Sequence, residues 1–439
     1  MSLNQKKQLK INQFKEMNGN IYLNRLFKAY YKEKKIEIPI INLFNEREFG
    51  FIPWEKHIMI RHVAFRNSEE LLQYLIDNGP KHVYSSGSLY LQPDNLEMDK
   101  KIYQGCDLII DIDVDHFYTP CKNNHDLWYC NTCGDSGKGM PLKCPKCKNV
   151  KLKTLTWICE DCLKTAKNEI IKLIDDFLIS DFGIKENQIK ITFSGHRGYH
   201  LKIENDRIRT LSSESRREIA DYITGDNLSF EILGLREDRS NIFGLLKDNI
   251  GWSQKIINKI EDILRNYSNL EIETILTKFG LNKNVIISFM NSKEDLLKVI
   301  SGNTQNLWNI EGFGIKTWKI FLKGIVKEIG VKIDEPVTID IHRLIRYPGS
   351  LHGKTGFKVQ EINLEELSNF NPLNESREKL DPIVFKSEGS LHKLEIIEKD
   401  VPITKIKGKR YGPYKKGDII EVPHHIAVFL LCREVAKSI

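Results

Sequence analysis

The spacing of hydrophobic positions along the chain predicts both helices and strands. Apolar side chains return every three or four positions over 69–78 and 167–182, which is typical of helices with one buried face. A β-branched, apolar run predicts a strand over 106–114. Residues 188–193 and 199–203 predict a hairpin around a polar turn that contains glycine. The chain therefore mixes the two periodicities.

The order of these elements predicts an α+β fold with inserted segments. Residues 205–330 are helical in pattern almost throughout, and strands and turns return from 331 onward. The last segment combines short strands with one helix over 427–438. The first 35 residues, rich in Lys and Asn, predict a loosely held helix or arm. The expected division is a strand-bearing domain (1–117, 166–204 and 331–372), a cysteine-rich insert (118–165), a helical subdomain (205–330) and a small C-terminal module (373–439).

Composition and charge narrow the class of protein. With 439 residues, 41% hydrophobic and 28% charged, the chain is neither collagen-like nor wholly disordered. No apolar run approaches the roughly 18–20 residues of a membrane helix, and no apolar core follows the charged N-terminus. We therefore expect an intracellular, cytoplasmic protein without a membrane partner. A net charge of +7 permits a nucleic-acid partner without requiring one.

Two aspartates interrupt the 106–114 strand at alternate positions. Asp111 and Asp113 project from the same face of the strand. Two carboxylates at such a short separation repel each other unless a cation lies between them, and Mg²⁺ and Mn²⁺ favour such oxygen ligands. A solvated edge strand is the alternative, but the apolar neighbours indicate burial, which is costly for unpaired carboxylates. The pair therefore predicts a metal site suited to phosphoryl or nucleotidyl transfer.

Two glycine-containing segments further along the chain carry cationic and imidazole side chains. Residues 194–200 read SGHRGYH, in which glycine lets the backbone approach an anion while Arg and His donate hydrogen bonds. Residues 333–356 add a third carboxylate, Asp334, together with Arg343, Arg346, His352 and Lys354. Taken singly, an ordinary polar turn and a basic surface loop are the alternatives. Together the segments predict a site for metal and phosphate.

Seven of the nine cysteines fall within 121–162, which in a reducing compartment indicates metal ligands. The pairs Cys130-x₂-Cys133 and Cys144-x₂-Cys147 have the spacing of a tetrahedral zinc ribbon. Cross-brace pairing with the remaining cysteines and an iron–sulfur cluster are the alternatives.

Five segments, in this order, resemble the catalytic small subunit of archaeal and eukaryotic DNA primases, in its archaeal form. They are REFGF (47–51), VYSSGSLY (83–90), DLIIDIDVDHF (107–117), SGHRGYHLKI (194–203) and IDEPVTIDIHRLIRYPGSLHGKTG (333–356). The resemblance implies a primase-type mixed catalytic domain with a zinc-binding insert. It also implies de novo synthesis of short primers on single-stranded DNA by two-metal nucleotidyl transfer, with release of pyrophosphate.

The resemblance also implies roles for particular residues. Two Mg²⁺ or Mn²⁺ ions are expected on Asp111, Asp113 and Asp334, and the nucleotide phosphates on Ser194, Arg197, His200, Arg346 and His352. A small zinc element of the family matches Cys121, His125, Cys159 and Cys162, so the ribbon of Cys130, Cys133, Cys144 and Cys147 would be a second structural zinc site. His196 stands where relatives often have Arg, and Glu48 and Arg61 fall in motifs near the active site.

The partners implied by the resemblance are a single-stranded DNA template, NTPs with dNTPs as further candidates, and a large primase subunit in a nucleoid-associated heterodimer. The C-terminal module resembles small modules of archaeal replication proteins, which suggests docking to such proteins. Two other functions remain as alternatives: a primase-like repair polymerase that needs a primer, and a noncatalytic, zinc-dependent nucleic-acid-binding subunit. The presence of all three aspartates argues against the noncatalytic one.

Overall fold

The computed structural model describes residues 19–33, 38–55, 58–247, 250–302, 306–386, 389 and 391–439. The expected N-terminal arm lies partly outside the described residues, and its described part, 19–33, is a helix. Contacts divide the chain into two compact units. Of the described residues, the first unit takes those up to Ile171, Ile184–Arg217 and Ile333–Ile439, and the second takes Lys172–Gly183 and Glu218–Lys332. The four-part division expected from the sequence stays a prediction.

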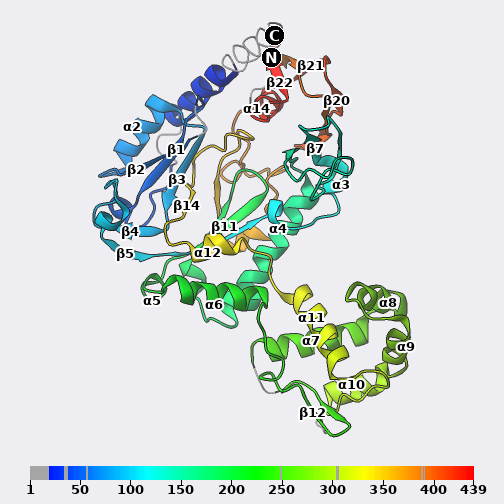
Figure 1. The fold of residues 1–439 in the computed structure, drawn as a ribbon. Helices are drawn as coiled ribbons and strands as arrows, with labels where there is room; N and C mark the ends of the chain where they lie inside the picture. Colours follow the sequence, from blue (N-terminus) through cyan, green and yellow to red (C-terminus); the bar gives the residue numbers. More distant parts are fainter. Residues whose placement is uncertain are drawn as a thin grey trace. The chain divides into compact units, whose positions relative to one another are not determined.

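Two four-stranded antiparallel sheets form the centre of the first unit (Figure 1). The first sheet has the order β14-β3-β1-β2, with β1 (Phe49–Ile52), β2 (Ile60–Val63), β3 (His82–Ser86) and β14 (Leu344–Arg346). The second has the order β15-β10-β11-β6, with β6 (Leu108–Asp113), β10 (Ile189–Phe193), β11 (Gly198–Ile203) and β15 (Gln360–Ile362). Both sheets therefore combine strands from distant parts of the sequence.

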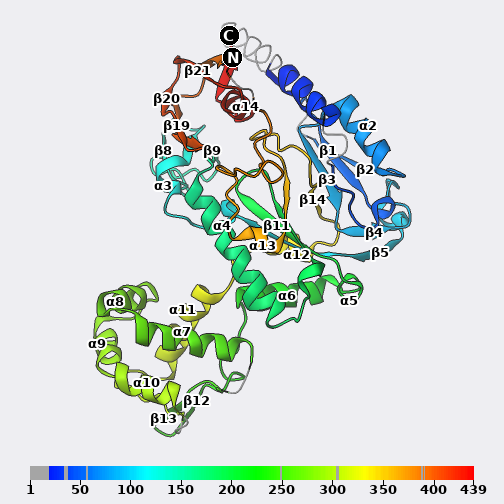
Figure 2. The same ribbon diagram turned by 180° about the vertical axis from the view of Figure 1, so that it is seen from behind.

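The helices beside these sheets begin and end where local chemistry dictates. Helix α2 (Ser68–Asn78) starts at Asn67, whose side chain accepts from the backbone N–H of Glu70, and stops at Gly79 in the left-handed conformation. Helix α4 (Glu160–Lys172) continues as a π-helical segment, Leu173–Ile179. The predicted helix over 167–182 therefore exists but begins seven residues earlier. Figures 1 and 2 place α2 against the first sheet and α4 alongside the second.

The predicted hairpin is confirmed as β10 and β11, paired from Ile189–Ile203 to Phe193–Tyr199. The predicted strand over 106–114 is β6, and Cys106 instead ends a separate strand, β5 (Tyr103–Cys106), which pairs with β4 (Ser88–Tyr90). On β6 the burial alternates, so Ile110 and Ile112 are fully buried while Asp111 and Asp113 keep partial exposure on the other face. The alternation read from the sequence is therefore correct.

The cysteine-rich insert is a small sheet of order β8-β7-β9, made of β7 (Leu127–Cys130), β8 (Ser136–Lys138) and β9 (Leu152–Leu155), after the short helix α3 (Lys122–His125). Its apolar centre is small: Trp128, Cys130 and Cys144 are buried, with Cys133 and Leu152 against them. A core of this size needs metal or another cross-link to hold its shape.

The second unit is mainly helical. Its helices include α7 (Trp252–Asn266), α8 (Asn269–Lys278), α9 (Lys283–Asn291), α10 (Lys293–Ser301) and α11 (Ile315–Ile329). Aromatic rings fill its core, with Trp308 and Trp318 at 4.9 Å and Phe289 and Phe321 at 5.3 Å between ring centroids. The expectation that 205–330 is helical almost throughout misses one hairpin, β12 (Arg236–Asp238) with β13 (Asn241–Phe243).

The C-terminal segment folds into the first unit as a sheet of order β21-β16-β22 with one helix. The strands are β16 (Leu391–Ile396), β21 (Ile419–Pro423) and β22 (Ala436–Ser438), and the helix is α14 (His424–Cys432). The predicted helix over 427–438 is therefore wrong in its second half. Glu434 adopts the left-handed conformation (φ 58°), and the chain turns back so that Val435 N–H donates to Leu430 O.

The mixture of helix and sheet confirms the α+β fold class. Among the described helices, none combines the length and the apolar character that crossing a membrane requires.

Candidate active site

The fold brings three predicted carboxylates to one place. Asp111 and Asp113 lie on β6, and the backbone N–H of Asp334 donates to the backbone O of Asp111 at 2.8 Å. Asp334 immediately precedes the short helix α12 (Glu335–Ile339). The side chains of Asp111 and Asp334 are only 15% and 12% exposed. Three acidic groups therefore lie near one another, and the side chains of Asp111 and Asp334 have little exposure to solvent.

Electrostatics at these carboxylates favour a cation. Burial, followed by repulsion from Asp113 and Asp334, raises the pKa of Asp111 well above its usual range. Its Oδ1 atom is buried without a hydrogen-bond partner, and it lies 3.5 Å from His200 Nε2. Burial, followed by Asp115, also raises the pKa of Asp113. A buried carboxylate oxygen without a partner, close to other carboxylates that repel it, fits a divalent metal such as Mg²⁺ or Mn²⁺.

Close approach of β11 to β6 fixes these carboxylates. Gly198 pairs with Asp113, and His200 pairs with Asp111. A Cβ atom on Gly198 would lie 2.4 Å from Ile112 O and 2.9 Å from Asp113 Cα. Only glycine fits between the two strands here.

A second group consists of three histidines: His196 and His352 lie on the two glycine-containing segments singled out in the sequence, and His82 lies at the start of β3. The rings of His196 and His352 stack with centroids 5.3 Å apart, and His82 meets His352 edge-on at 4.9 Å. Burial is the main cause that lowers the pKa of each ring well below its usual range, so all three are neutral at pH 7. Gly195 (φ 81°) allows the turn that carries His196 to approach His352 this closely, because a Cβ atom at position 195 would lie 2.7 Å from His352 Cβ.

Hydrogen bonds link this histidine cluster to its two segments. Ser194 Oγ accepts from the backbone N–H groups of His196 and Gly198 at 3.3 Å, and Thr355 Oγ1 donates to Gly195 O at 2.6 Å. Arg346 Nη1 lies 2.8 Å from His82 Nδ1. Burial, followed by Arg346, lowers the pKa of His200 to about 3. The cluster therefore presents neutral imidazoles beside an arginine that forms no ion pair among the described residues.

The loop that carries His352 is supported by both ends of the chain. From the helix over 19–33, Tyr30 Oη donates to Gly349 O at 3.0 Å, and Tyr31 Oη accepts from Leu351 N–H at 3.1 Å. From α14, Phe429 stacks on Phe357 at 5.8 Å between centroids. The position of His352 therefore depends on segments that no motif marks.

Arg197 is placed differently from what a phosphate contact would suggest. Its side chain is fully buried, with Nη1 2.9 and 3.0 Å from the two carboxylate oxygens of Asp126 and 2.9 Å from Trp157 O. Its Nη2 pairs with Asp115. Burial opposes the charge, but Asp115 and Asp126 raise the pKa of Arg197 above its usual range. Sequence reasoning missed Asp126, since an acidic residue beside a zinc ligand is too common to stand out.

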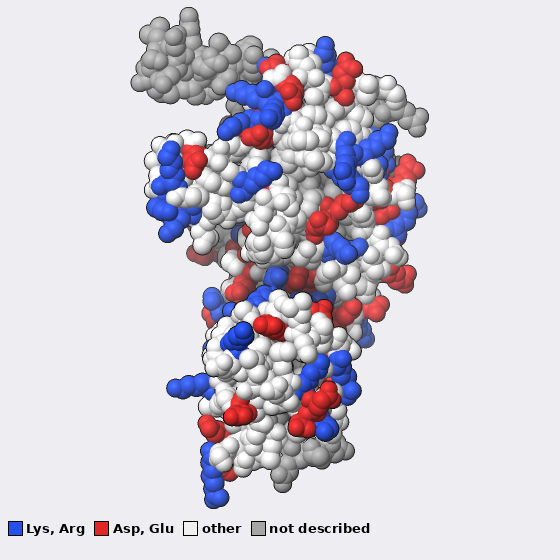
Figure 3. Space-filling model, turned by 90° about the vertical axis from the view of Figure 1, so that its right-hand side faces the viewer, with Lys and Arg blue, Asp and Glu red and all other residues white. Residues whose placement is uncertain are grey.

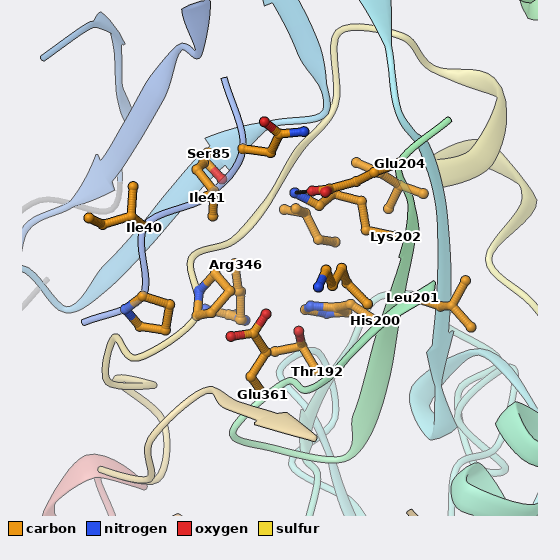
Figure 4. Close-up of a pocket in the computed structure, with 16 residues that line it drawn as sticks. Ile40, Ile41, Ser85, Thr192, His200, Leu201, Lys202, Glu204, Arg346 and Glu361 are labelled. Carbon is orange, nitrogen blue, oxygen red and sulfur yellow. Dashed lines mark ion pairs between the residues drawn. The ribbon is translucent and has the colours of Figure 1, made fainter. Parts of the chain in front are cut away.

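A cavity of about 350 Å³ opens between the two sheets (Figure 4). Arg346 (β14) and Ser85 (β3) line one side, and Thr192, His200 and Glu361 of the second sheet line the other. Lys202 of β11 also points into it, and burial lowers its pKa. A polar cavity of this volume, next to the carboxylates through His200, is suited to a small ligand. Only His200 and Arg346 of these residues were expected from the sequence.

The metal-ligating side chains of the insert form two separate groups. They are Cys121, His125, Cys159 and Cys162, and Cys130, Cys133, Cys144 and Cys147, with the ligand atoms of each group within 4.8 Å of one another. Sulfur atoms lie 3.3 Å apart at Cys121–Cys162 and 3.4 Å apart at Cys130–Cys147. A tetrahedral zinc with Zn–S bonds of about 2.3 Å separates its sulfurs by about 3.8 Å, so both groups fit zinc. This arrangement is the one expected and excludes cross-brace pairing.

The first zinc-type group is connected to the catalytic sheet. Asp126 Oδ1 lies 2.8 Å from Nδ1 of the ligand His125, while its carboxylate also binds Arg197 of the β10–β11 turn. Such outer carboxylates orient metal-binding histidines. The insert is therefore attached to the site through Asp126.

The distribution of surface charge gives less evidence for a function than the site around the three aspartates does. On the face drawn in Figure 3, Lys and Arg side chains stand in several separate groups with acidic side chains among them. A single basic track is not visible on this face. The evidence for a function therefore comes from the side chains around Asp111, Asp113 and Asp334.

Comparison with known proteins agrees with this geometry. The family model described as DNA primase small subunit matches residues 152–364. The DNA primase small subunit of Methanothrix thermoacetophila is 32% identical over 96% of this chain and 99% of its own length. Those of Methanocella arvoryzae (31%; 94% of this chain, 96% of its own length) and Nitrosopumilus maritimus (29%; 94% and 97%) are similar over nearly full length. By this near full-length identity, the chain belongs to the DNA primase small subunit family.

Proposed function

We propose that this chain is the catalytic subunit of a DNA primase, a nucleotidyltransferase that synthesises primers de novo on single-stranded DNA. Membership of the family supports the activity. The observation that supports the chemistry is that Asp111, Asp113 and Asp334 lie near one another, with Oδ1 of Asp111 buried and without a hydrogen-bond partner. These three carboxylates would hold two Mg²⁺ or Mn²⁺ ions.

Each residue of the site has a part in this reaction. Divalent metal bound by the three carboxylates supplies activation of a 3′-hydroxyl and neutralisation of the departing pyrophosphate. Neutral His352 and the turn at Ser194 donate hydrogen bonds to phosphate oxygens, and Arg346 adds positive charge. His200, held neutral between Asp111 and Arg346, is positioned to donate to a non-bridging oxygen. Arg197 orients the turn from within, through Asp126, and supports binding indirectly.

We assign the sugar and base of the incoming nucleotide to the cavity between the two sheets. It adjoins the phosphate residues through Arg346 and His200, and its Ser85, Thr192 and Glu361 offer hydrogen bonds to hydroxyl groups. Ribonucleotides and deoxyribonucleotides are both candidates for this cavity. The small-subunit family implies a DNA template and a large primase subunit as partners, within a nucleoid-associated heterodimer.

The two cysteine-rich groups are proposed to hold one structural zinc each. Four protein ligands close each site, which leaves no position for a reacting water. Metal analysis of the purified chain should give about two zinc per chain, and a value near one would remove the assignment of the ribbon.

The test is synthesis on an unprimed single-stranded DNA with labelled ATP or dATP and Mg²⁺ or Mn²⁺. Wild type should make products, and the Asp111→Ala/Asp113→Ala variant should make none while still binding DNA. The matched control is Asp99→Ala, because Asp99 is exposed to solvent. Products made only on an annealed primer would favour a repair polymerase, and DNA binding without any synthesis would favour a noncatalytic subunit.

A further inference from the structure

Arg433, in the turn after α14, reaches the histidine cluster from the C-terminal segment. Its Nη1 lies 3.4 Å from His196 Nε2, its Nη2 donates to Thr156 O, and its guanidinium lies over the ring of Trp157 at 5.7 Å. Its Nε atom is buried and makes no hydrogen bond. Neither the sequence motifs nor the proposed chemistry gives this arginine a role.

The charge of Arg433 lacks a carboxylate partner. No ion pair joins it to an acidic side chain among the described residues, although its head is only partly exposed. Burial, followed by Arg197, lowers the pKa of Arg433 to about 10. A guanidinium that is partly desolvated and unpaired is costly, and a bound anion would offset this cost.

Further cationic and imidazole side chains lie near Arg433 and could bind the same anion. Lys354 is exposed and also forms no ion pair among the described residues. His196 is buried and neutral, and burial followed by Arg433 lowers its pKa. Arg346 stands on the far side of the cluster, at His82. Positive charge without a carboxylate partner thus lies beside the stacked imidazoles.

The packing of α14 shows that this placement is specific. A Cβ on Gly356 would lie 2.6 Å from Val428 Cγ1, so the helix lies directly on the loop that carries His352. Trp157 meets Phe429 at 5.4 Å between centroids, and Glu434 pairs with Lys81 at 3.0 Å. The turn after α14 is thereby fixed at both sides, and Arg433 is held at the cluster by neighbours on two segments.

We propose that Arg433 binds the terminal phosphate of the incoming nucleotide, so that the C-terminal module completes the triphosphate site and selects triphosphates over diphosphates. This inference rests on the proposed function, in which the reacting phosphate lies at the three aspartates. Arg433 makes no hydrogen bond to those aspartates and joins the site through His196, which assigns it to the other end of the triphosphate. The planar fork of an arginine suits two oxygens of one terminal phosphate.

Calorimetric binding of ATP, ADP, inorganic triphosphate and pyrophosphate to the full chain, in Mg²⁺, tests the proposal. Wild type should prefer ATP to ADP and triphosphate to pyrophosphate. Arg433→Gln should lose about tenfold in affinity for ATP and for triphosphate, because a charge-assisted contact is removed, while affinity for ADP and pyrophosphate stays the same. The matched control is Arg410→Gln, an exposed arginine of the same module, which should keep every affinity.

The outcomes separate this inference from the proposed function. An unchanged ATP-to-ADP ratio in folded Arg433→Gln, or an equal loss for both ligands, would mean that Arg433 only supports the fold, and would overturn the proposal. If Arg433→Gln does not fold, Arg433→Lys is measured instead. We expect its ATP-to-ADP affinity ratio to fall about threefold, and an unchanged ratio would overturn the inference. Failure of wild type to bind any nucleotide would instead count against the proposed function.

Discussion

Asp126 joins the cysteine-rich insert to the turn between β10 and β11, and replacing it by asparagine tests that link. The side chain is fully buried and receives Arg197, His125 Nδ1 and the backbone N–H of Trp157, all at 2.8 to 3.0 Å. Burial opposes ionisation, but His125 and Arg197 lower the pKa of Asp126, so it is charged at pH 7. Asparagine keeps the shape and removes the charge.

The magnitude follows from what the substitution leaves behind. Removing one partner of a buried ion pair costs about 3–5 kcal/mol, because the other charge stays desolvated. Asp115 still pairs with Arg197, so we expect the lower end, about 3 kcal/mol. Loss of the contact to His125 should also weaken metal binding at the first zinc group by about 10- to 100-fold.

Thermal unfolding and zinc transfer to a chelator measure the two effects. We expect Asp126→Asn to melt several degrees below wild type and to release one zinc early and the other at the wild-type rate. Asp161→Asn, an exposed aspartate beside the ligand Cys162, is the control and should behave as wild type. Equal melting with unchanged release of both zinc ions would refute the link through Asp126.

Three further changes test the site. Gly198→Ala should cost about 2–3 kcal/mol of stability and abolish synthesis, since its Cβ would meet Ile112 O at 2.4 Å, whereas Gly314→Ala, with nothing within 4 Å, should leave synthesis intact. Asp111→Asn should raise the unfolding free energy of the metal-free chain by about 1 kcal/mol while abolishing synthesis, because it removes a repelled charge; a fall in stability would contradict this. His82 stays neutral when folded but binds a proton when unfolded below its ordinary pKa of about 6.5, so stability is lost as pH falls. Between pH 7.5 and 5.5, urea unfolding of wild type should therefore lose about 1.4 kcal/mol more than that of His82→Gln, and parallel losses would reject the assignment.

The features that the sequence predicts well are those set by local pattern. Alternation placed Asp111 and Asp113 on one face of a strand. Cysteine spacing predicted the ribbon group of Cys130, Cys133, Cys144 and Cys147, whereas the other metal group came from the family resemblance. The end of α14 was missed because Ile426–Cys432 is apolar on every side, so no amphipathic stripe marks where the helix stops. The hairpin at Arg236–Phe243 is short and polar at one strand, which hides its alternation.

The features that the sequence does not show depend on partners from distant segments. Arg197 reads as a phosphate ligand until Asp126 and Asp115 are seen beside it. His82 and Arg433 belong to no motif of the site, yet one contacts His352 and the other His196. Which of two chemically reasonable contacts an arginine makes is decided by tertiary packing, and local sequence carries no record of it.

The support of the His352 loop from both ends of the chain has a consequence for biosynthesis. The helix over 19–33 is translated well before α14, which covers the same loop. A chain still being made lacks Phe429 and Arg433, and so has neither the support of the loop nor the last arginine of the cluster. Contacts of such long sequence separation form late, after the intervening segments have folded. We therefore expect the His352 loop to take its final position only after α14 has been translated, although the three aspartates precede that helix in the chain.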